Sequence, residues 1–197
     1  MIYKGLQLVA VQLSEFIEPI AGPSEVILGN IALAEAPNQN ELVNKVIITM
    51  VNIEEESTLK NGASYQKLTN MARYTNPPVY MNLYSLISAH YPQSYDISLK
   101  RLSSVIKFFQ SRNTFNLSNA QPLANDLNLN DPEDMSISLN FELYTLTFEQ
   151  INHLWGSLGG KQMPSVMYKI RLVAIEDRST VRETPLIEEI QKAHIPK

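Results

Sequence analysis

Residues able to support catalysis or bind a metal are few and widely spaced in this sequence. His90, His153 and His194 show no metal-ligand spacing to one another, and the chain contains no cysteine. Zinc sites and thiolate nucleophiles therefore lack their usual residues. No phosphate-binding glycine loop, dinucleotide-binding fingerprint or serine-hydrolase motif occurs. The sequence thus predicts no catalytic residue, no metal site and no cofactor.

Acidic and glycine-rich stretches offer only weak alternatives. Glu54, Glu55 and Glu56 are consecutive, and on an extended chain their carboxylates point in different directions, so a solvated charge run explains them better than a metal site. Glu142 and Glu149 could pair, but nothing places them in one cleft. The glycines within Gly156–Gly160 end a predicted helix, which is the wrong dipole end for binding a phosphate. We therefore expect a protein that is not an enzyme.

Composition indicates an ordinary globular chain. Of the 197 residues, 44% are hydrophobic and 18% charged, with a net charge of −4, which is enough for one core and argues against disorder and nucleic-acid binding. No stretch reaches the roughly 20 apolar residues that span a membrane. The opening residues have an apolar stripe at helical spacing and no cleavage signal, so we expect a core-packed helix and a soluble product made in the cytoplasm.

The elements that would carry any site alternate between strands and helices. Lys45–Ile53 is apolar on both faces, which predicts a central strand. Further strands are expected in four other segments: Glu25–Ala34, Val79–Ile87, Ser136–Tyr144 and Val166–Ile175. Thr114–Leu117 is compatible with one more short strand. The pattern by itself predicts a soluble domain of mixed α/β structure.

Two internal helices are expected beside this sheet. The first has apolar residues three and four apart, and we expect this stripe to face the core: Tyr95, Leu99, Leu102, Ile106 and Phe109. The second spans Thr147–Leu158, where Thr147 and Gln150 form a capping-box pattern and two glycines follow the last turn.

Polar segments separate these elements. Glu54–Pro78 and Ser111–Met135 are long and irregular in pattern, and such segments are often functional. Glu176–Lys197 is charged, with a possible short helix at Leu186–Ala193. We expect a domain at residues 1–177 and a C-terminal arm at residues 178–197 that either docks on a partner or stays mobile.

Several stretches in order resemble a known family. They are NKVIITMVNIEEE, NPPVYMNLYSLISAHY, YDISLKRLSSVIKFFQ and LNFELYTLTFEQINHLWGSLGGKQMPSVMYKIRLVAI. Together with the opening helix they resemble the Pvc16-type N-terminal domain, found in cap proteins of contractile injection systems, which are phage-tail-like particles with a sheath and an inner tube. The resemblance covers nearly the whole chain and rests on residues that build the fold.

This resemblance implies a tail terminator with the fold of phage tail-terminator proteins. That fold is an α+β fold with a mixed, mainly antiparallel sheet and flanking helices. Six copies would form a ring that ends the inner tube and ties it to the last sheath layer. The implied partners are other copies of the chain, the tube protein and the sheath protein, in a particle that is cytoplasmic, membrane-associated or released from the cell. The C-terminal arm is the segment expected to reach the sheath.

Residues for these contacts are expected in the two long polar segments and the arm, because a cyclic ring needs two different surfaces on each subunit. The candidates are Glu54, Glu55, Glu56, Asn61, Asn116, Asn119, Arg178, Arg182, Leu186, Ile187 and Ile190. Two other interpretations stay open. One is a neck or tube-initiation component of the same kind of particle, and the other is a small-molecule-binding module with its pocket near Tyr80, Tyr84 and Trp155.

Overall fold

The computed structural model describes residues 2–22, 25–36, 40–56, 65–67, 71–76, 78–116, 137–175 and 180–185. The chain divides into two compact units: Met1–Glu55 with Met81–Val173, and Glu56–Tyr80 with Ala174–Lys197. Each is described by itself below. Among the described helices, none is both long and apolar enough to cross a membrane.

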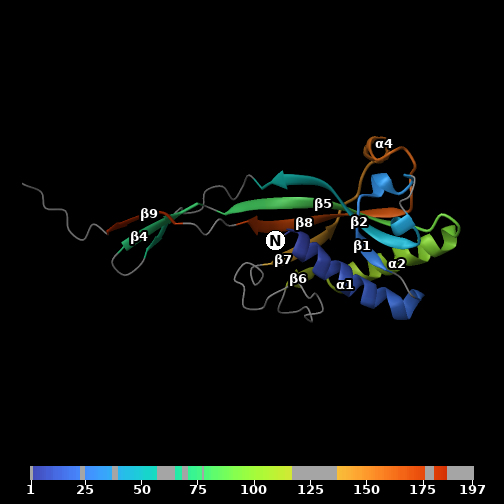
Figure 1. The fold of residues 1–197 in the computed structure, drawn as a ribbon, viewed down its shortest axis with the longest axis horizontal. Helices are drawn as coiled ribbons and strands as arrows, with labels where there is room; N and C mark the ends of the chain where they lie inside the picture. Colours follow the sequence, from blue (N-terminus) through green and yellow to red (C-terminus); the bar gives the residue numbers. More distant parts are fainter. Residues whose placement is uncertain are drawn as a thin grey trace, which may run out of the picture. The chain divides into compact units, whose positions relative to one another are not determined.

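The first unit is organised around a six-stranded sheet with the order β1-β2-β5-β8-β7-β6 (Figure 1). The strands are β1 (Val26–Leu28), β2 (Lys45–Glu55), β5 (Val79–His90), β6 (Thr114–Asn116), β7 (Ser138–Leu143) and β8 (Ser165–Ile175). β1 runs parallel to β2, whereas the β2–β5, β6–β7 and β7–β8 pairs are antiparallel. The helices that flank it are α1 (Ile2–Ala21), α2 (Tyr95–Ser111) and α4 (Phe148–Ser157), with 3-10 turns η1 (Ile31–Leu33) and η2 (Asn40–Leu42). The predicted α+β class is confirmed.

The second unit contains a three-stranded antiparallel sheet in the order β3-β4-β9. Its strands are β3 (Tyr65–Lys67), β4 (Met71–Thr75) and β9 (Thr180–Pro185). The irregular structure predicted for Glu54–Pro78 is therefore wrong at the end of β2 and at β3 and β4, while residues 57–64, 68–70 and 77 lie outside the described residues. These strands escape prediction because they are short and polar, and because β4 pairs with a strand about a hundred residues away, so no local pattern marks them.

The expected C-terminal arm is described only in part. Thr180–Pro185 forms β9, with Arg182 opposite Tyr74 of β4. The expected boundary between residues 177 and 178 lies outside the described residues, as does the possible helix at Leu186–Ala193.

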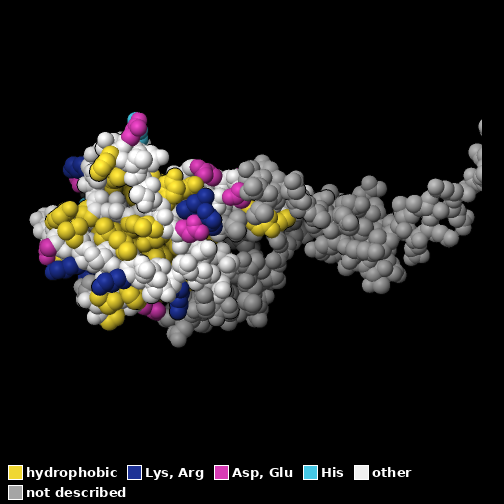
Figure 2. Space-filling view, turned by 180° about the vertical axis from the view of Figure 1, so that it is seen from behind, with side chains coloured by type: hydrophobic (Ala, Val, Ile, Leu, Met, Phe, Trp, Pro, Cys, Tyr) yellow, Lys and Arg dark blue, Asp and Glu magenta, His cyan; other side chains and the backbone are white. Residues whose placement is uncertain are grey.

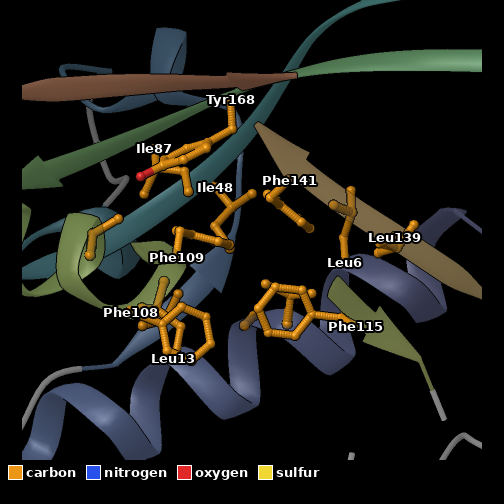
Figure 3. Close-up of a cluster of buried hydrophobic side chains, with 14 of the residues drawn as sticks. Leu6, Leu13, Ile48, Ile87, Phe108, Phe109, Phe115, Leu139, Phe141 and Tyr168 are labelled. Carbon is orange, nitrogen blue, oxygen red and sulfur yellow. The ribbon is translucent and has the colours of Figure 1, made fainter. Parts of the chain in front are cut away.

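The main core lies between one face of the six-stranded sheet and the helices α1 and α2 (Figure 3). The apolar stripe of α1 enters it as predicted, with Leu6, Val9 and Leu13 buried. Six aromatic rings meet there, and the Phe109 ring centroid lies 4.6 Å from that of Phe141 and 4.4 Å from that of Tyr168. Aromatic burial and close ring packing together make this cluster the main source of stability.

The helix α1 continues past Pro19 and ends at Ala21. Pro19 lacks the N–H that would bond to the carbonyl of Glu15, but Glu15 is exposed, so water can satisfy that carbonyl. Gly22 then ends the helix with φ of 82° and donates its N–H to the Glu18 carbonyl at 3.0 Å.

A second, smaller core lies on the opposite face of the same sheet, under α4 and η1. Trp155 of α4 is buried there with Ile47 of β2 and Leu86 of β5. The predicted capping box is present: the Gln150 N–H donates to Thr147 Oγ1 at 3.3 Å, and the Thr147 N–H donates to Gln150 Oε1 at 2.9 Å. This local signal fixes where α4 begins and thereby how Trp155 meets the sheet.

The burial of α2 differs from the prediction. Of the expected stripe only Phe109 is buried, whereas Tyr95, Leu99 and Ile106 are 67%, 44% and 40% exposed. The buried face instead consists of Ser98, Arg101, Ser104, Val105, Phe108 and Phe109.

Two of the buried polar residues of α2, Arg101 and Ser104, form hydrogen bonds within the first unit. Arg101 Nη1 donates to the Gly22 carbonyl at 2.7 Å, and its guanidinium lies 5.8 Å from the Tyr91 ring centroid. Ser104 Oγ donates to the Lys100 carbonyl at 3.1 Å. Small serines and one bonded arginine can therefore face the core, which leaves the apolar stripe on the outside.

Candidate interaction surfaces

The sequence-predicted interface residues lie in different parts of the chain. Glu54 and Glu55 are exposed at the end of β2, and Glu56 follows directly. Asn116 is the last residue of β6, and Arg182 lies within β9. The other candidates fall outside the described residues: Asn61, Asn119, Arg178, Leu186, Ile187 and Ile190.

Two of these candidates share one face of the six-stranded sheet. The side chains of Glu54 and Asn116 point to the side opposite the main core. Their strand neighbours Ile53 and Phe115 pair with Leu83 and Leu139, which belong to the main core, and side chains alternate between the two faces along a strand. In the strand order their strands are four positions apart, which corresponds to roughly 19 Å at the usual spacing between strands. They belong to one surface without touching each other.

This surface, called the open sheet face below, is polar from strand to strand. Its residues are Asn52, Glu54, Tyr84, Lys169, Arg171, Ser138, Asn140, Glu142, Thr114 and Asn116. Arg171 Nε donates to Glu142 Oε2 at 2.8 Å, and Lys169 Nζ lies 5.6 Å from the centroid of the Tyr84 ring. Charges of both signs alternate across it, which suits a contact with a polar protein surface.

Tyr84 is held in place on this face by Glu54. Its hydroxyl donates to Glu54 Oε2 at 2.9 Å, and Asn52 Nδ2 donates to the other carboxylate oxygen at 3.2 Å. Partial burial, together with this hydrogen bond to a carboxylate, raises the pKa of Tyr84 to about 12. The phenol therefore stays neutral and remains a donor, so Glu54 is an ordered acceptor and not a freely moving charge.

The histidines have structural surroundings. His90 is buried, burial lowers its pKa, and its Nδ1 lies 3.2 Å from Met163 Sδ. His153 is exposed on α4, 3.8 Å from a Glu149 carboxylate oxygen, and His194 lies outside the described residues. Within the described part of the chain, no group of three or more His, Cys, Asp or Glu side chains could hold a metal ion.

An apolar groove of about 640 Å³ lies in the first unit. It is lined by the exposed stripe of α2, the connection from β7 to α4, α4 itself and the segment that enters β8. The lining residues used below are Tyr95, Leu99, Leu102, Leu143, Ile151 and Leu154. Figure 2 shows hydrophobic side chains gathered in a band on the face turned away from the viewer in Figure 1. Sequence reasoning found the α2 residues of this groove but assigned them to the core.

The aromatic residues suggested for a pocket can be placed one by one, and Tyr84 packs against the smaller core that contains Trp155. Trp155 lines the apolar groove, whereas the Tyr84 hydroxyl is engaged with Glu54 on the open sheet face. Tyr80 is half-buried in the part of β5 that belongs to the second unit.

Comparison with known families identifies the chain over nearly its whole length. The model of the Pvc16 N-terminal domain matches residues 6–189. The chain belongs to this family. The resemblance seen in the sequence is thus confirmed, including the stretches from the opening helix to the last strand of the first unit. The comparison with curated proteins gives no match.

Two solved structures share the fold of this Pvc16 N-terminal domain. One is the PVC sheath/tube terminator of an extracellular contractile injection system in its extended state, with 11% identity and a TM-score of 0.66; the match covers 100% of this chain and 64% of that one. The other is the tube-terminating cap of the anti-feeding prophage, with 14% identity and a TM-score of 0.58, over 96% of this chain and 60% of that one. The chain thus spans less than two thirds of the length of either protein.

Proposed function

We propose that this protein is a structural cap, or tube terminator, of an extracellular contractile injection system, and that it has no enzymatic activity. The observation that carries the proposal is the family match over residues 6–189, joined to a fold shared with two terminators. The surfaces of the first unit support it, because they offer an apolar groove for contact and an ordered polar group at Glu54.

In this proposal six copies form a ring that ends the inner tube and binds the last layer of the sheath. A closed ring joins two different patches of neighbouring subunits. The first unit has two surfaces of different character, the polar open sheet face and the apolar groove. A polar face suits a contact with the tube or sheath, whereas apolar surface suits the permanent contacts between subunits.

The residues proposed for these contacts are those expected from the sequence. They are Glu54, Glu55, Glu56, Asn61, Asn116, Asn119, Arg178, Arg182, Leu186, Ile187 and Ile190. Glu54 has the best structural support among them, because Tyr84 and Asn52 fix its carboxylate on the open sheet face.

The decisive test is the native mass of the purified protein at low and high concentration, with and without added inner tube. A six-subunit ring, or six copies bound at each tube end, is the expected result. A protein that stays monomeric and ignores tubes contradicts the proposal.

A particle-length measurement separates the cap from a tube-initiation component. Without a cap, inner tubes should grow to uncontrolled length, whereas without an initiator no tubes should form. Cells that lack this protein are therefore expected to contain overlong tubes, and restoring the protein should restore a uniform length. An absence of tubes would instead favour the initiation role.

A further inference from the structure

The apolar groove has no explanation in the fold itself. Its α2 side consists of Tyr95, Leu99 and Leu102, and Tyr95 and Leu99 are 67% and 44% exposed although the main core lies on the neighbouring side of the same helix. Leu143, which faces it from the end of β7, is 60% exposed. Apolar side chains gathered in one groove usually mark a binding surface, whereas single exposed ones do not.

The shape and lining of the groove suit an amphipathic helix. The helix α2 lines the groove with Leu99 and Leu102, and the helix α4 lines it with Ile151 and Leu154. Apolar side chains therefore face the groove from both helices. Helix-in-groove recognition uses apolar anchors three or four residues apart on the bound segment.

The C-terminal segment of this chain has that pattern. Leu186, Ile187 and Ile190 fall on one side of a helix, while Glu188, Glu189 and Lys192 fall on the other. Pro185, directly before them, suits the first turn of a helix.

We infer that the apolar groove of one copy binds residues 186–193 of a neighbouring copy. Every lining residue belongs to the first unit, whereas the segment continues from β9 of the second unit. An exchange of this segment from copy to copy is a heterologous contact, which closes into a ring when the rotation allows. The inference deepens the proposed function and rests on it, and it gives the arm a neighbouring copy as its partner in place of the sheath.

Because the sequence contains no cysteine, any introduced cysteine is the only thiol on its chain that a maleimide crosslinker can join. One tagged chain carries Leu99→Cys and a second, differently tagged chain carries Ile190→Cys. After mixing, a short bis-maleimide is expected to give a product that contains both tags. Glu149→Cys, on a side chain of α4 that is 85% exposed, is the control in place of Leu99→Cys and should give little product.

A further substitution tests whether the apolar contact is the cause. Leu102→Asp, added to the Leu99→Cys chain, should lower the mixed product at least about tenfold, because a carboxylate would have to be buried against Ile190. Ser103→Asp, at an exposed neighbouring position, should leave the yield nearly unchanged.

Each outcome separates this inference from the proposed ring. A six-copy ring without mixed product overturns the inference and leaves the ring. Mixed product in an assembly of another size supports the inference and contradicts the sixfold ring. A third chain carries both Leu99→Cys and Ile190→Cys, and if it crosslinks only within itself, the exchange between copies is overturned. If the Ile190→Cys chain crosslinks to added sheath protein and to no other copy, the arm binds the sheath and the inference is overturned.

Discussion

At the scale of single residues, two tyrosines link this protein's stability to alkaline pH. Burial raises the pKa of Tyr168 to about 12, and burial with the Glu54 hydrogen bond does the same for Tyr84. An unfolded tyrosine titrates near pH 10. The folded state thus favours the neutral phenols, so their contribution to stability is complete below about pH 10 and is lost as the pH rises toward 12.

We expect the free energy of unfolding to fall between about pH 10 and 12, and to fall less steeply in Tyr168→Phe and Tyr84→Phe. Urea unfolding at a series of pH values measures this. Tyr3→Phe is the matched control, because Tyr3 is 61% exposed and should leave the slope unchanged. Equal slopes in all four proteins would contradict the role of the two shifted tyrosines.

The cap of α4 is a second residue-scale feature, and it was readable from the sequence because Thr147 and Gln150 signal it locally. Both hydrogen bonds of the capping box are present. Thr147→Ala should therefore cost about 1 kcal/mol of unfolding free energy. Thr145→Ala, at an exposed position two residues earlier, should change it by less than about 0.5 kcal/mol. Similar losses in both variants would mean that the cap itself contributes little.

At the scale of elements, prediction succeeded where the pattern was local and failed where a distant partner decides. The apolar spacing of α1 specifies its buried side directly, and this was predicted. The two-sided apolar run of β2 correctly predicts burial at residues 46–49, whereas Ile53 at its end is 48% exposed. The helix α2 has more apolar surface than one face needs, so periodicity found the helix but selected its outer side. Its inner side is set by α1 and Gly22, through Arg101 and the buried serines.

The orientation of α2 gives a direct test. Phe109 is 4% exposed and Ile106 is 40% exposed. Phe109→Ala should cost about 3–5 kcal/mol, whereas Ile106→Ala should cost much less because most of its lost contacts are at the surface. If the Phe109→Ala protein fails to fold, Phe109→Leu should still destabilise more than Ile106→Ala. The reverse order would mean that the predicted stripe, and not the observed face, is buried.

At the scale of the whole molecule, the two units differ in how far sequence reveals them. The first unit builds its sheet and two cores from elements with strong local patterns. The second unit depends on the pairing of β4 with β9, which no local signal predicts. The sequence named Glu54 as an interface candidate, and the structure shows its carboxylate in ordered hydrogen bonds. The apolar groove could not be predicted in the same way, because its lining comes from α2 and α4, which are about 40 residues apart in the sequence.

The same division predicts that the first unit folds without the C-terminal residues. Trp155 is the only tryptophan and is buried in the first unit, so its fluorescence reports the unfolding of that unit alone. A chain truncated after Ile175 loses β9 and the arm but keeps both cores. Its fluorescence-detected unfolding free energy should match that of the full chain within about 0.5 kcal/mol, while a truncation after Pro185 serves as the control that retains β9.

In the proposed cap, both truncated proteins would stay folded and fail to end tubes, because the arm is missing from each. A large loss of stability in the shorter chain alone would show that β9 supports the first unit, and normal capping by either chain would show that the arm is dispensable.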